Sequence, residues 1–127
     1  MKSEVNCIVN QTNLIDKKSE VLFQGTAELV DNQLTYYEQI IPHAKTKIEV
    51  SENFIQIIRI GEASTKVKLF KNKNGCAIVS SELGELEFET TLKYCEILRN
   101  SWLFEYQIMS ENEIILHTSI ECKFSEN

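Results

Sequence analysis

The chain has 127 residues, 43% of them hydrophobic and 25% charged, which suits one compact domain with its own core. We therefore predict a single domain over residues 1–127. One Pro and four Gly, without a Ser-, Gln- or Pro-rich tract, exclude a low-complexity or disordered chain. The net charge of −6 works against binding to nucleic acid and other anionic partners.

The N-terminal residues MKSEVNCIVNQTN alternate polar and apolar types and lack the apolar centre of a signal peptide. No apolar run in the chain is long enough to span a bilayer. These features predict a cytoplasmic protein without a membrane partner. The four cysteines lie far apart with no Cys-x-x-Cys pair, so we expect free thiols, most of them buried, and neither a metal nor a cofactor.

Apolar and polar residues alternate along most of the chain, which is typical of β-strands with one buried face. We predict strands over residues 4–11, 19–30, 34–39, 44–51, 54–60, 65–70, 76–80, 85–92, 102–108 and 114–124. About eight to ten short strands joined by sequential hairpins predict an all-β, antiparallel meander. Closing the meander into a barrel removes the exposed strand edges.

The same alternation predicts which side chains face the interior. The expected inward side chains include Val21, Phe23, Gly25, Ala27, Leu29, Leu86, Phe88, Thr90, Ile114, Leu116, Thr118, Ile120, Cys122 and Phe124. Gly25 offers a bend in a long strand. The outer face of residues 85–92 carries Glu85, Glu87 and Glu89, which we interpret as a solubilising rail rather than a catalytic group.

The orientation of the strand that carries Arg59 depends on the preceding turn, because this strand is apolar on both faces. A two-residue loop at residues 52–53 places Thr46 opposite Arg59, whereas a three-residue loop at residues 51–53 places Lys45 there. Directly opposed like charges are unfavourable, so we predict the two-residue loop. Arg59 then points toward the core.

Glu38, Thr46 and Arg59 form the most distinctive polar group of the sequence. A five-residue connection around Pro42 would place Glu38 beside Thr46, and Thr46 beside Arg59, in one row across three strands. One interpretation is a structural network that closes the barrel, because buried polar groups are ordinarily hydrogen-bonded. The other is that Arg59 anchors an anionic ligand, since a guanidinium recognises carboxylates well.

Aromatic residues would complete such a ligand site. Tyr36 or Tyr37 could donate a hydroxyl, and Trp102 and Tyr106 belong to an apolar inner face that could line a cavity. An eight-stranded barrel is just wide enough to be filled by side chains or to hold one small ligand. We expect a largely filled interior with a small pocket at one mouth, and a non-enzymatic binding module for a small apolar or anionic ligand.

Two other functions stay open. The first is a nucleic-acid or protein adaptor that uses an outer lysine face made by Lys45, Lys47, Lys66 and Lys68. Phe70 is the only aromatic residue clearly expected on that face, so the stacking platform of a single-strand binder is missing. The second is an enzyme that uses Glu38 and Arg59. His43 and His117 have no partners at the spacing of metal ligands.

Three runs of the sequence resemble a known family: GTAELVDNQLTYYEQ, AKTKIEVSENFIQIIRIGEASTKVKLF and LGELEFETT. They resemble the YwiB-like proteins of low-GC Gram-positive bacteria, a family of unknown function with a lipocalin-like (calycin) β-barrel. The matching features span residues 21–92 and include Gly25, Tyr37-Glu38, Thr46, Arg59 with Gly61, Phe70, Gly84-Glu85-Leu86 and Thr90. The resemblance implies a small closed barrel and a cytoplasmic bacterial setting, with no assigned catalytic residue.

Overall fold

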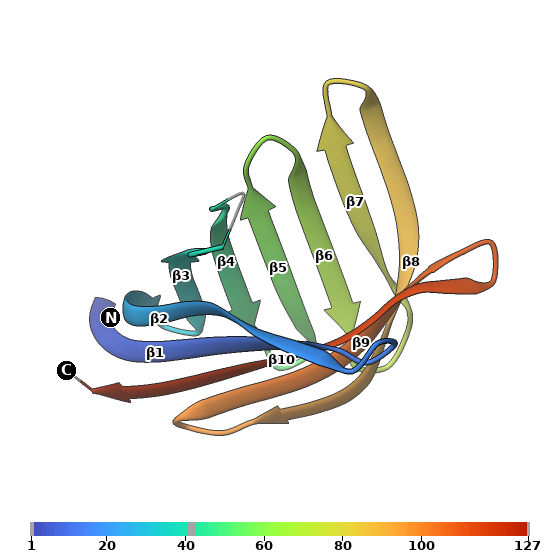
Figure 1. The fold of residues 1–127 in the computed structure, drawn as a ribbon. Helices are drawn as coiled ribbons and strands as arrows, with labels where there is room; N and C mark the ends of the chain where they lie inside the picture. Colours follow the sequence, from blue (N-terminus) through green and yellow to red (C-terminus); the bar gives the residue numbers. More distant parts are fainter. Residues whose placement is uncertain (1, 41–42, 127) are drawn as a thin grey trace.

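The protein is a closed antiparallel barrel of ten strands, seen in a computed structural model that describes residues 2–40 and 43–126 (Figure 1). Each strand pairs with its neighbours in the sequence, and the last strand closes the barrel on the first. The strands are β1 (Lys2–Asn13), β2 (Lys18–Val30), β3 (Gln33–Tyr37), β4 (Lys45–Val50), β5 (Phe54–Ile60), β6 (Ser64–Phe70), β7 (Gly75–Ser81), β8 (Gly84–Ile97), β9 (Ser101–Ser110) and β10 (Glu113–Glu126). The predicted all-β, antiparallel meander barrel is confirmed. In the part of the chain that the structure describes, no helix is long and apolar enough to cross a membrane.

The β4–β5 hairpin has the predicted register. Thr46 lies directly opposite Arg59, and the backbone nitrogen of Ser51 donates to the carbonyl oxygen of Phe54 at 2.8 Å, which closes a two-residue loop. The β2–β3 hairpin also has a two-residue loop, in which Asp31 adopts a φ of 54°. Short loops of this kind fix the register and so decide which side chains face inward.

Bulges interrupt the register of the longer strands. One extra residue lies in β2 at Leu22, one in β8 at Lys93 and one in β10 at Ile115. A bulge bends its strand and reverses the alternation of side chains at that point. Long strands can therefore follow the curve of the barrel wall (Figure 1).

Three predicted inward positions are wrong. Leu22 is buried in place of Val21, which is 45% exposed, because the bulge in β2 shifts the alternation. The bulge in β10 likewise leaves Ile114 exposed. Leu86 is exposed for a different reason. It points to the same side of the sheet as the inward-facing residues, but the β7–β8 hairpin projects beyond the rest of the barrel (Figure 1).

Apolar side chains fill the middle of the barrel. Trp102 packs edge-on against Phe124 with ring centroids 5.0 Å apart, and Phe104 is completely buried. A fully buried side chain of this size stabilises the fold by about 1.5–3 kcal/mol. All four cysteines are free, and Cys7 and Cys122 belong to this core. Burial raises the pKa of the Cys7 thiol to about 12.

Gly75 permits a close approach between β6 and β8. A Cβ atom at this position would clash with the carbonyl oxygen of Lys68 and would lie 2.9 Å from Oγ1 of Thr90. The Thr90 hydroxyl donates a hydrogen bond of 2.8 Å to that same carbonyl oxygen. A larger residue at Gly75 would therefore push the two strands apart.

Candidate functional site

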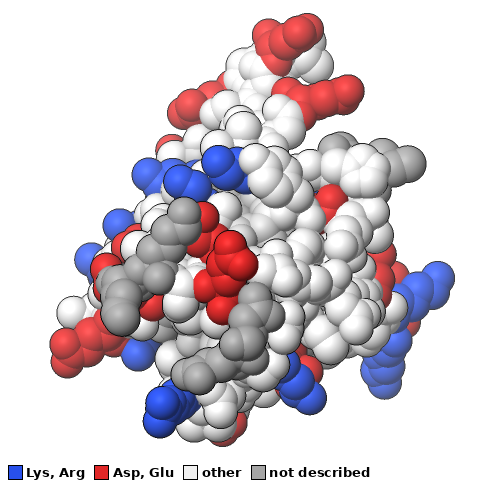
Figure 2. Space-filling model, turned by 90° about the vertical axis from the view of Figure 1, so that its left-hand side faces the viewer, with Lys and Arg blue, Asp and Glu red and all other residues white. Residues whose placement is uncertain are grey.

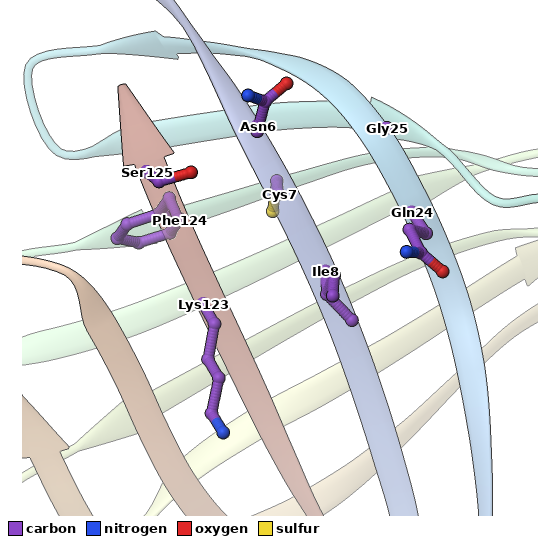
Figure 3. Close-up of a pocket in the computed structure, with 8 residues that line it drawn as sticks. All are labelled: Asn6, Cys7, Ile8, Gln24, Gly25, Lys123, Phe124 and Ser125. Atoms are coloured by element: carbon purple, nitrogen blue, oxygen red, sulfur yellow. The ribbon is translucent and has the colours of Figure 1, made fainter. Parts of the chain in front are cut away.

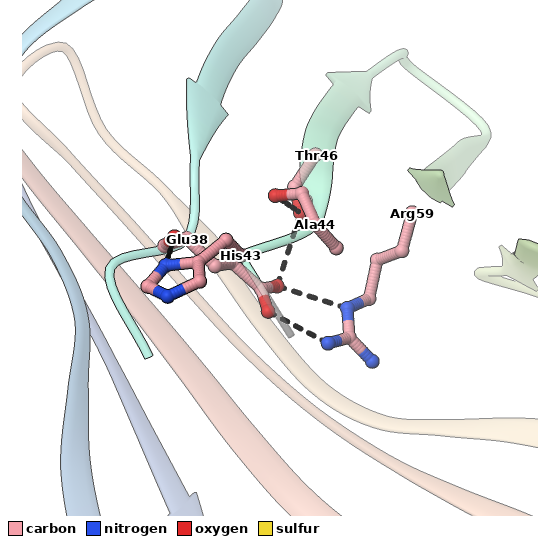
Figure 4. A network of polar contacts seen from close by, with 5 residues as sticks. All are labelled: Glu38, His43, Ala44, Thr46 and Arg59. Carbon is pink, nitrogen blue, oxygen red and sulfur yellow. Dashed lines mark hydrogen bonds and ion pairs between the residues drawn. The ribbon is translucent and has the colours of Figure 1, made fainter. Parts of the chain in front are cut away.

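A buried ion pair links the end of β3 to β5 (Figure 4). The Arg59 guanidinium donates from Nε to Oε2 of Glu38 at 2.9 Å and from Nη2 to Oε1 at 2.6 Å. Thr46 on β4 donates from its hydroxyl to Oε2 of Glu38 at 3.0 Å. This two-point geometry fixes the plane of the guanidinium as well as its position.

The two partners differ in their exposure to solvent. The Glu38 side chain is 1% exposed and the Arg59 side chain is 40% exposed. The hydrogen bond to Glu38 raises the pKa of Arg59 and outweighs the opposite effect of burial, so the guanidinium stays protonated. Glu38 is therefore the interior member of the pair, and Arg59 extends from it toward water.

The predicted row of Glu38, Thr46 and Arg59 is wrong in one detail. The residue opposite Thr46 on β3 is Tyr36, because β3 ends at Tyr37 and Glu38 lies beyond the ladder. The Glu38 backbone nitrogen donates to the carbonyl oxygen of Ala44 at 2.9 Å, and only its side chain reaches Thr46. Pro42, on which the predicted connection depended, lies outside the described residues.

His43 holds the connection that follows Glu38. Its Nδ1 lies 3.2 Å from the carbonyl oxygen of Glu38, and its backbone adopts a φ of 60° (Figure 4). The ring is exposed and contacts the backbone of Glu38 rather than its carboxylate. His43 therefore helps to position the buried acid without taking part in the ion pair.

Two buried tyrosines lie near Arg59. Tyr36 is 3% exposed and Tyr106, on β9, is 6% exposed. Burial raises the pKa of Tyr36 and raises that of Tyr106 to about 12, while the positive charge of Arg59 acts on both rings in the opposite direction. Both phenols are therefore neutral at physiological pH and can donate a hydrogen bond.

Three donors of this group have no partner among the described residues: Nη1 of Arg59 and the hydroxyls of Tyr36 and Tyr106. No buried side-chain nitrogen or oxygen in the described part of the chain lacks a hydrogen bond. None of the three atoms is therefore completely buried, although all three belong to inward-facing side chains. They form a set of free donors that we call the donor group.

The inward-facing positions next to Arg59 on the following three strands become apolar with distance from it. The row runs from Arg59 through Thr65 and Val79 to Leu86. Val79 is half-buried and Leu86 is 63% exposed, so the inner surface is open to solvent at this end of the barrel. The donor group thus has an apolar lip on one side.

Tyr37 and Trp102, which were also predicted to bind the ligand, do not belong to the donor group. Tyr37 points outward, is 61% exposed and lies under the ammonium of Lys45, 5.9 Å from its ring centroid. Trp102 is buried against Phe124, four residues before Tyr106 and so about 13 Å away along the strand. Of the two candidate hydroxyl donors on β3, Tyr36 is the one that faces inward.

The outer lysine face contains more aromatic surface than the sequence indicated. Phe54 lies opposite Phe70, with ring centroids 6.3 Å apart. The Lys68 ammonium lies 4.5 Å from the Phe54 centroid, and the Lys73 ammonium lies 4.7 Å from that of Phe70. The expectation that Phe70 alone is aromatic on this face is wrong, because the register of the β5–β6 hairpin places Phe54 beside it.

A surface depression of about 400 Å³ lies over β1, β2 and β10 (Figure 3). Its central row, Gly25, Cys7 and Phe124, has a glycine and two buried side chains, so the depression is floored mainly by backbone. Its flanking rows carry two amides, one hydroxyl, the apolar side chain of Ile8 and a single charged side chain, that of Lys123. We therefore regard the depression as a weaker candidate for a binding site than the donor group.

Fold and site together define a closed meander β-barrel with a polar group at one end of its interior. Residues 5–121 match the family described as "Domain of unknown function (DUF1934)", and the chain belongs to this family. The crystal structure of the ywiB protein from Bacillus subtilis is similar, with a TM-score of 0.71 and 18% sequence identity over 99% of this chain and 93% of that one. No curated protein matches the chain. The resemblance to YwiB-like proteins is confirmed, and the structural match extends to the fold.

Proposed function

We propose that this protein is a non-enzymatic binding protein that holds a small anionic, partly apolar molecule at the end of the barrel near Arg59. The observation that carries the proposal is the donor group, in which Nη1 of Arg59 and the hydroxyls of Tyr36 and Tyr106 lack partners among the described residues. Carboxylates and phosphates are the ligands that a guanidinium recognises best. The apolar lip formed by Val79 and Leu86 suits a short hydrocarbon group attached to the anion.

The Glu38–Arg59 pair supports this proposal by fixing the guanidinium before a ligand arrives. A side chain that is already ordered loses less conformational freedom on binding, which improves affinity. Glu38 also offsets one positive charge, so recognition would depend on directed hydrogen bonds more than on net charge. We therefore expect moderate affinity and selectivity for the shape of the anion.

The geometry argues against an acid–base role for Glu38. Both of its carboxylate oxygens already accept hydrogen bonds, Oε1 from Arg59 and Oε2 from Arg59 and Thr46. A general base needs a free oxygen within hydrogen-bond distance of the proton that it removes. Binding without catalysis is therefore the function that we favour.

Calorimetric titration with sodium octanoate and with octyl phosphate tests the proposal. We expect saturable binding of at least one of them to the wild type, and a loss of about fivefold to tenfold in affinity for Tyr106→Phe, which removes one hydroxyl donor. Tyr94→Phe is the matched control, because Tyr94 is exposed and donates to Glu96 on the protein surface. Equal losses in the two variants, or no saturable binding to the wild type, would contradict the proposal.

Native mass spectrometry gives an independent observation. The native mass of the purified protein is compared with its mass under denaturing conditions. A small molecule that co-purifies with the wild type and is lost from Tyr106→Phe supports binding at the donor group. The same molecule retained by both proteins would place binding elsewhere.

A further inference from the structure

The outer face of β6, β7 and β8 has a repeated arrangement of charge. In two rows across these strands a lysine, a central uncharged side chain and a glutamate follow one another: Lys66–Ile78–Glu87 and Lys68–Cys76–Glu89. The register makes these residues share one face, and the two rows are successive outward rows of the sheet. A positive edge and a negative edge therefore run parallel on either side of β7.

These charges have no ion-pair partner within the described residues. Lysine and glutamate of one row are separated by two strand spacings, about 9.5 Å, which is too far for a direct contact. The Lys68 ammonium lies over Phe54, which keeps its charge at the surface. Glu87 and Glu89 are exposed.

The centre of this face is partly apolar. Ile78 and Cys76 are half-buried, and Ile58 lies on the other side of Lys66 in the same row. A depression of about 260 Å³ is lined by Ile58, Ile78 and the small side chains of Ser64 and Ser80, among others. A sheet face with an apolar centre and charged edges can accept a second protein surface.

We propose that this face binds a second copy of the chain in a two-fold symmetric dimer whose axis runs parallel to β7. Rotation about that axis turns the face over onto itself and exchanges the β6 side with the β8 side. Lys66 of one copy then lies opposite Glu87 of the other, and Lys68 lies opposite Glu89. Ile78 lies on the axis and meets its own equivalent.

The self-complementary charge pattern is the reason for choosing a second copy as the occupant. A two-fold interface brings the same patch of both subunits together, so the patch must complement itself. This face meets that condition because each lysine has its glutamate at the same height on the opposite side of β7. Four ion pairs would form around an uncharged centre.

A nucleic-acid strand fits the same face less well. Glu85, Glu87 and Glu89 line the β8 side, and acidic side chains also cover the projecting end of the molecule, above a group of Lys and Arg side chains (Figure 2). Phosphates laid on the lysines would lie within a Debye length of these carboxylates. The net charge of −6 adds to the repulsion.

A charge-swap experiment tests the dimer. One variant combines Lys66→Glu with Lys68→Glu, and the other combines Glu87→Lys with Glu89→Lys. Each variant alone places like charges opposite one another, so we expect its dimer dissociation constant in sedimentation velocity to rise by at least about tenfold. In an equimolar mixture every pair has opposite charges again, and the affinity should return to within about threefold of the wild-type value.

A matched control and a second variant keep the test decisive. Lys17→Glu with Lys18→Glu makes the same change in net charge where the β1–β2 turn meets β2, and should leave the dimer intact. Ile78→Lys brings two equal charges together on the axis and should dissociate the dimer, whereas Ile114→Lys, at an exposed position on β10, should not.

Several results would overturn the proposal. The wild type could remain a monomer up to about 0.5 mM at low salt, where ion pairs are strongest. The reversed variants could dimerise as well as the wild type, or their mixture could fail to recover. A low-salt mobility shift of an oligothymidylate by the monomer, abolished by Lys66→Glu with Lys68→Glu, would assign the face to nucleic acid instead.

Discussion

Two polar pairs of the barrel have nearly the same contact distance and very different surroundings. Glu38 and Arg59 meet at 2.6 Å inside the barrel wall, by two hydrogen bonds, with Glu38 almost fully buried. Glu105 and His117 meet at 2.7 Å on the neighbouring strands β9 and β10, by one contact, with side chains 33% and 24% exposed. We call them the inner pair and the outer pair.

The effect of breaking a polar contact on stability depends on the surroundings of the partner that remains. Removal of one member of the outer pair leaves the other in reach of water. Removal of Arg59 leaves the Glu38 carboxylate in an apolar interior, with Thr46 as its remaining side-chain donor. A buried charge without its partner is strongly unfavourable, whereas a half-exposed one is not. Contact distance alone would have ranked the two pairs as equal.

The largest expected effect is that of Arg59→Leu. We expect the free energy of unfolding to fall by roughly 3 kcal/mol, at the low end for a broken buried pair because the guanidinium is 40% exposed. Urea denaturation of the wild type and variant measures the difference. Arg99→Leu is the control, because Arg99 is exposed. Equal stability of Arg59→Leu and the wild type would refute both a structural and a positioning role of the inner pair.

The buried tyrosine of the inner site should contribute a measurable pH dependence of stability. The pKa of Tyr106 is about 12 in the folded protein and 10 in the unfolded chain, so the folded state holds this proton more strongly. The stabilisation is complete below pH 10 and is lost as the pH rises toward 12, a change of roughly 2–3 kcal/mol. Tyr106→Phe should therefore lose less stability than the wild type between pH 10 and 12 in urea titrations.

The corresponding change at an exposed tyrosine serves as the comparison. Tyr94→Phe should stay close to the wild-type curve between pH 10 and 12, because the hydrogen bond to Glu96 that raises the pKa of Tyr94 lies at the protein surface, where solvent screens it. Parallel pH curves for Tyr106→Phe and the wild type would show that the buried phenol does not contribute to alkaline unfolding.

Glu38→Leu tests the other member of the inner pair. It leaves Arg59 without a partner, but the guanidinium already reaches water, so we expect a loss of roughly 1–2 kcal/mol, smaller than that of Arg59→Leu. The double variant Glu38→Leu with Arg59→Leu should be more stable than the sum of the two single losses predicts. Additive losses would mean that the two side chains act independently.

The smallest effect belongs to the outer pair. His117→Ala should lower the free energy of unfolding by less than about 1 kcal/mol, because a half-exposed pair gains little over hydration. Urea denaturation at pH 7 measures it beside Glu105→Ala, which should give a similar small value. A loss as large as that of Arg59→Leu would remove the distinction between the two pairs.

The sequence predicts the inner pair because short loops determine the register of the short strands. Once the loop at residues 52–53 has two residues, Thr46 must lie opposite Arg59, and both must face inward. The position of Glu38 beyond the end of β3 did not follow, because its backbone leaves the ladder there. Alternation showed only that Tyr36 and Tyr37 face opposite sides, and the structure assigns Tyr36 to the interior.

The long strands were less predictable. Each bulge at Leu22, Lys93 and Ile115 inserts one residue without a turn signal such as Gly or Asn, so alternation read from the sequence fails beyond it. Bulges depend on the curvature of the whole barrel, which is a property of the closed sheet rather than of a local segment. The misassigned side chains Val21 and Ile114 both lie beside one.

Side-chain NMR of the arginines tests the proposed anion site most directly. Arg59 and Arg99 are the arginines of the chain, so the Nε–H resonance of Arg99 is an internal reference for that of Arg59. The wild type is titrated with sodium octanoate and, separately, with octyl phosphate, and we predict a saturable shift of the Arg59 resonance with at least one of them and none of the Arg99 resonance. No shift of Arg59 with either compound, or equal shifts of both arginines, would contradict binding at the donor group.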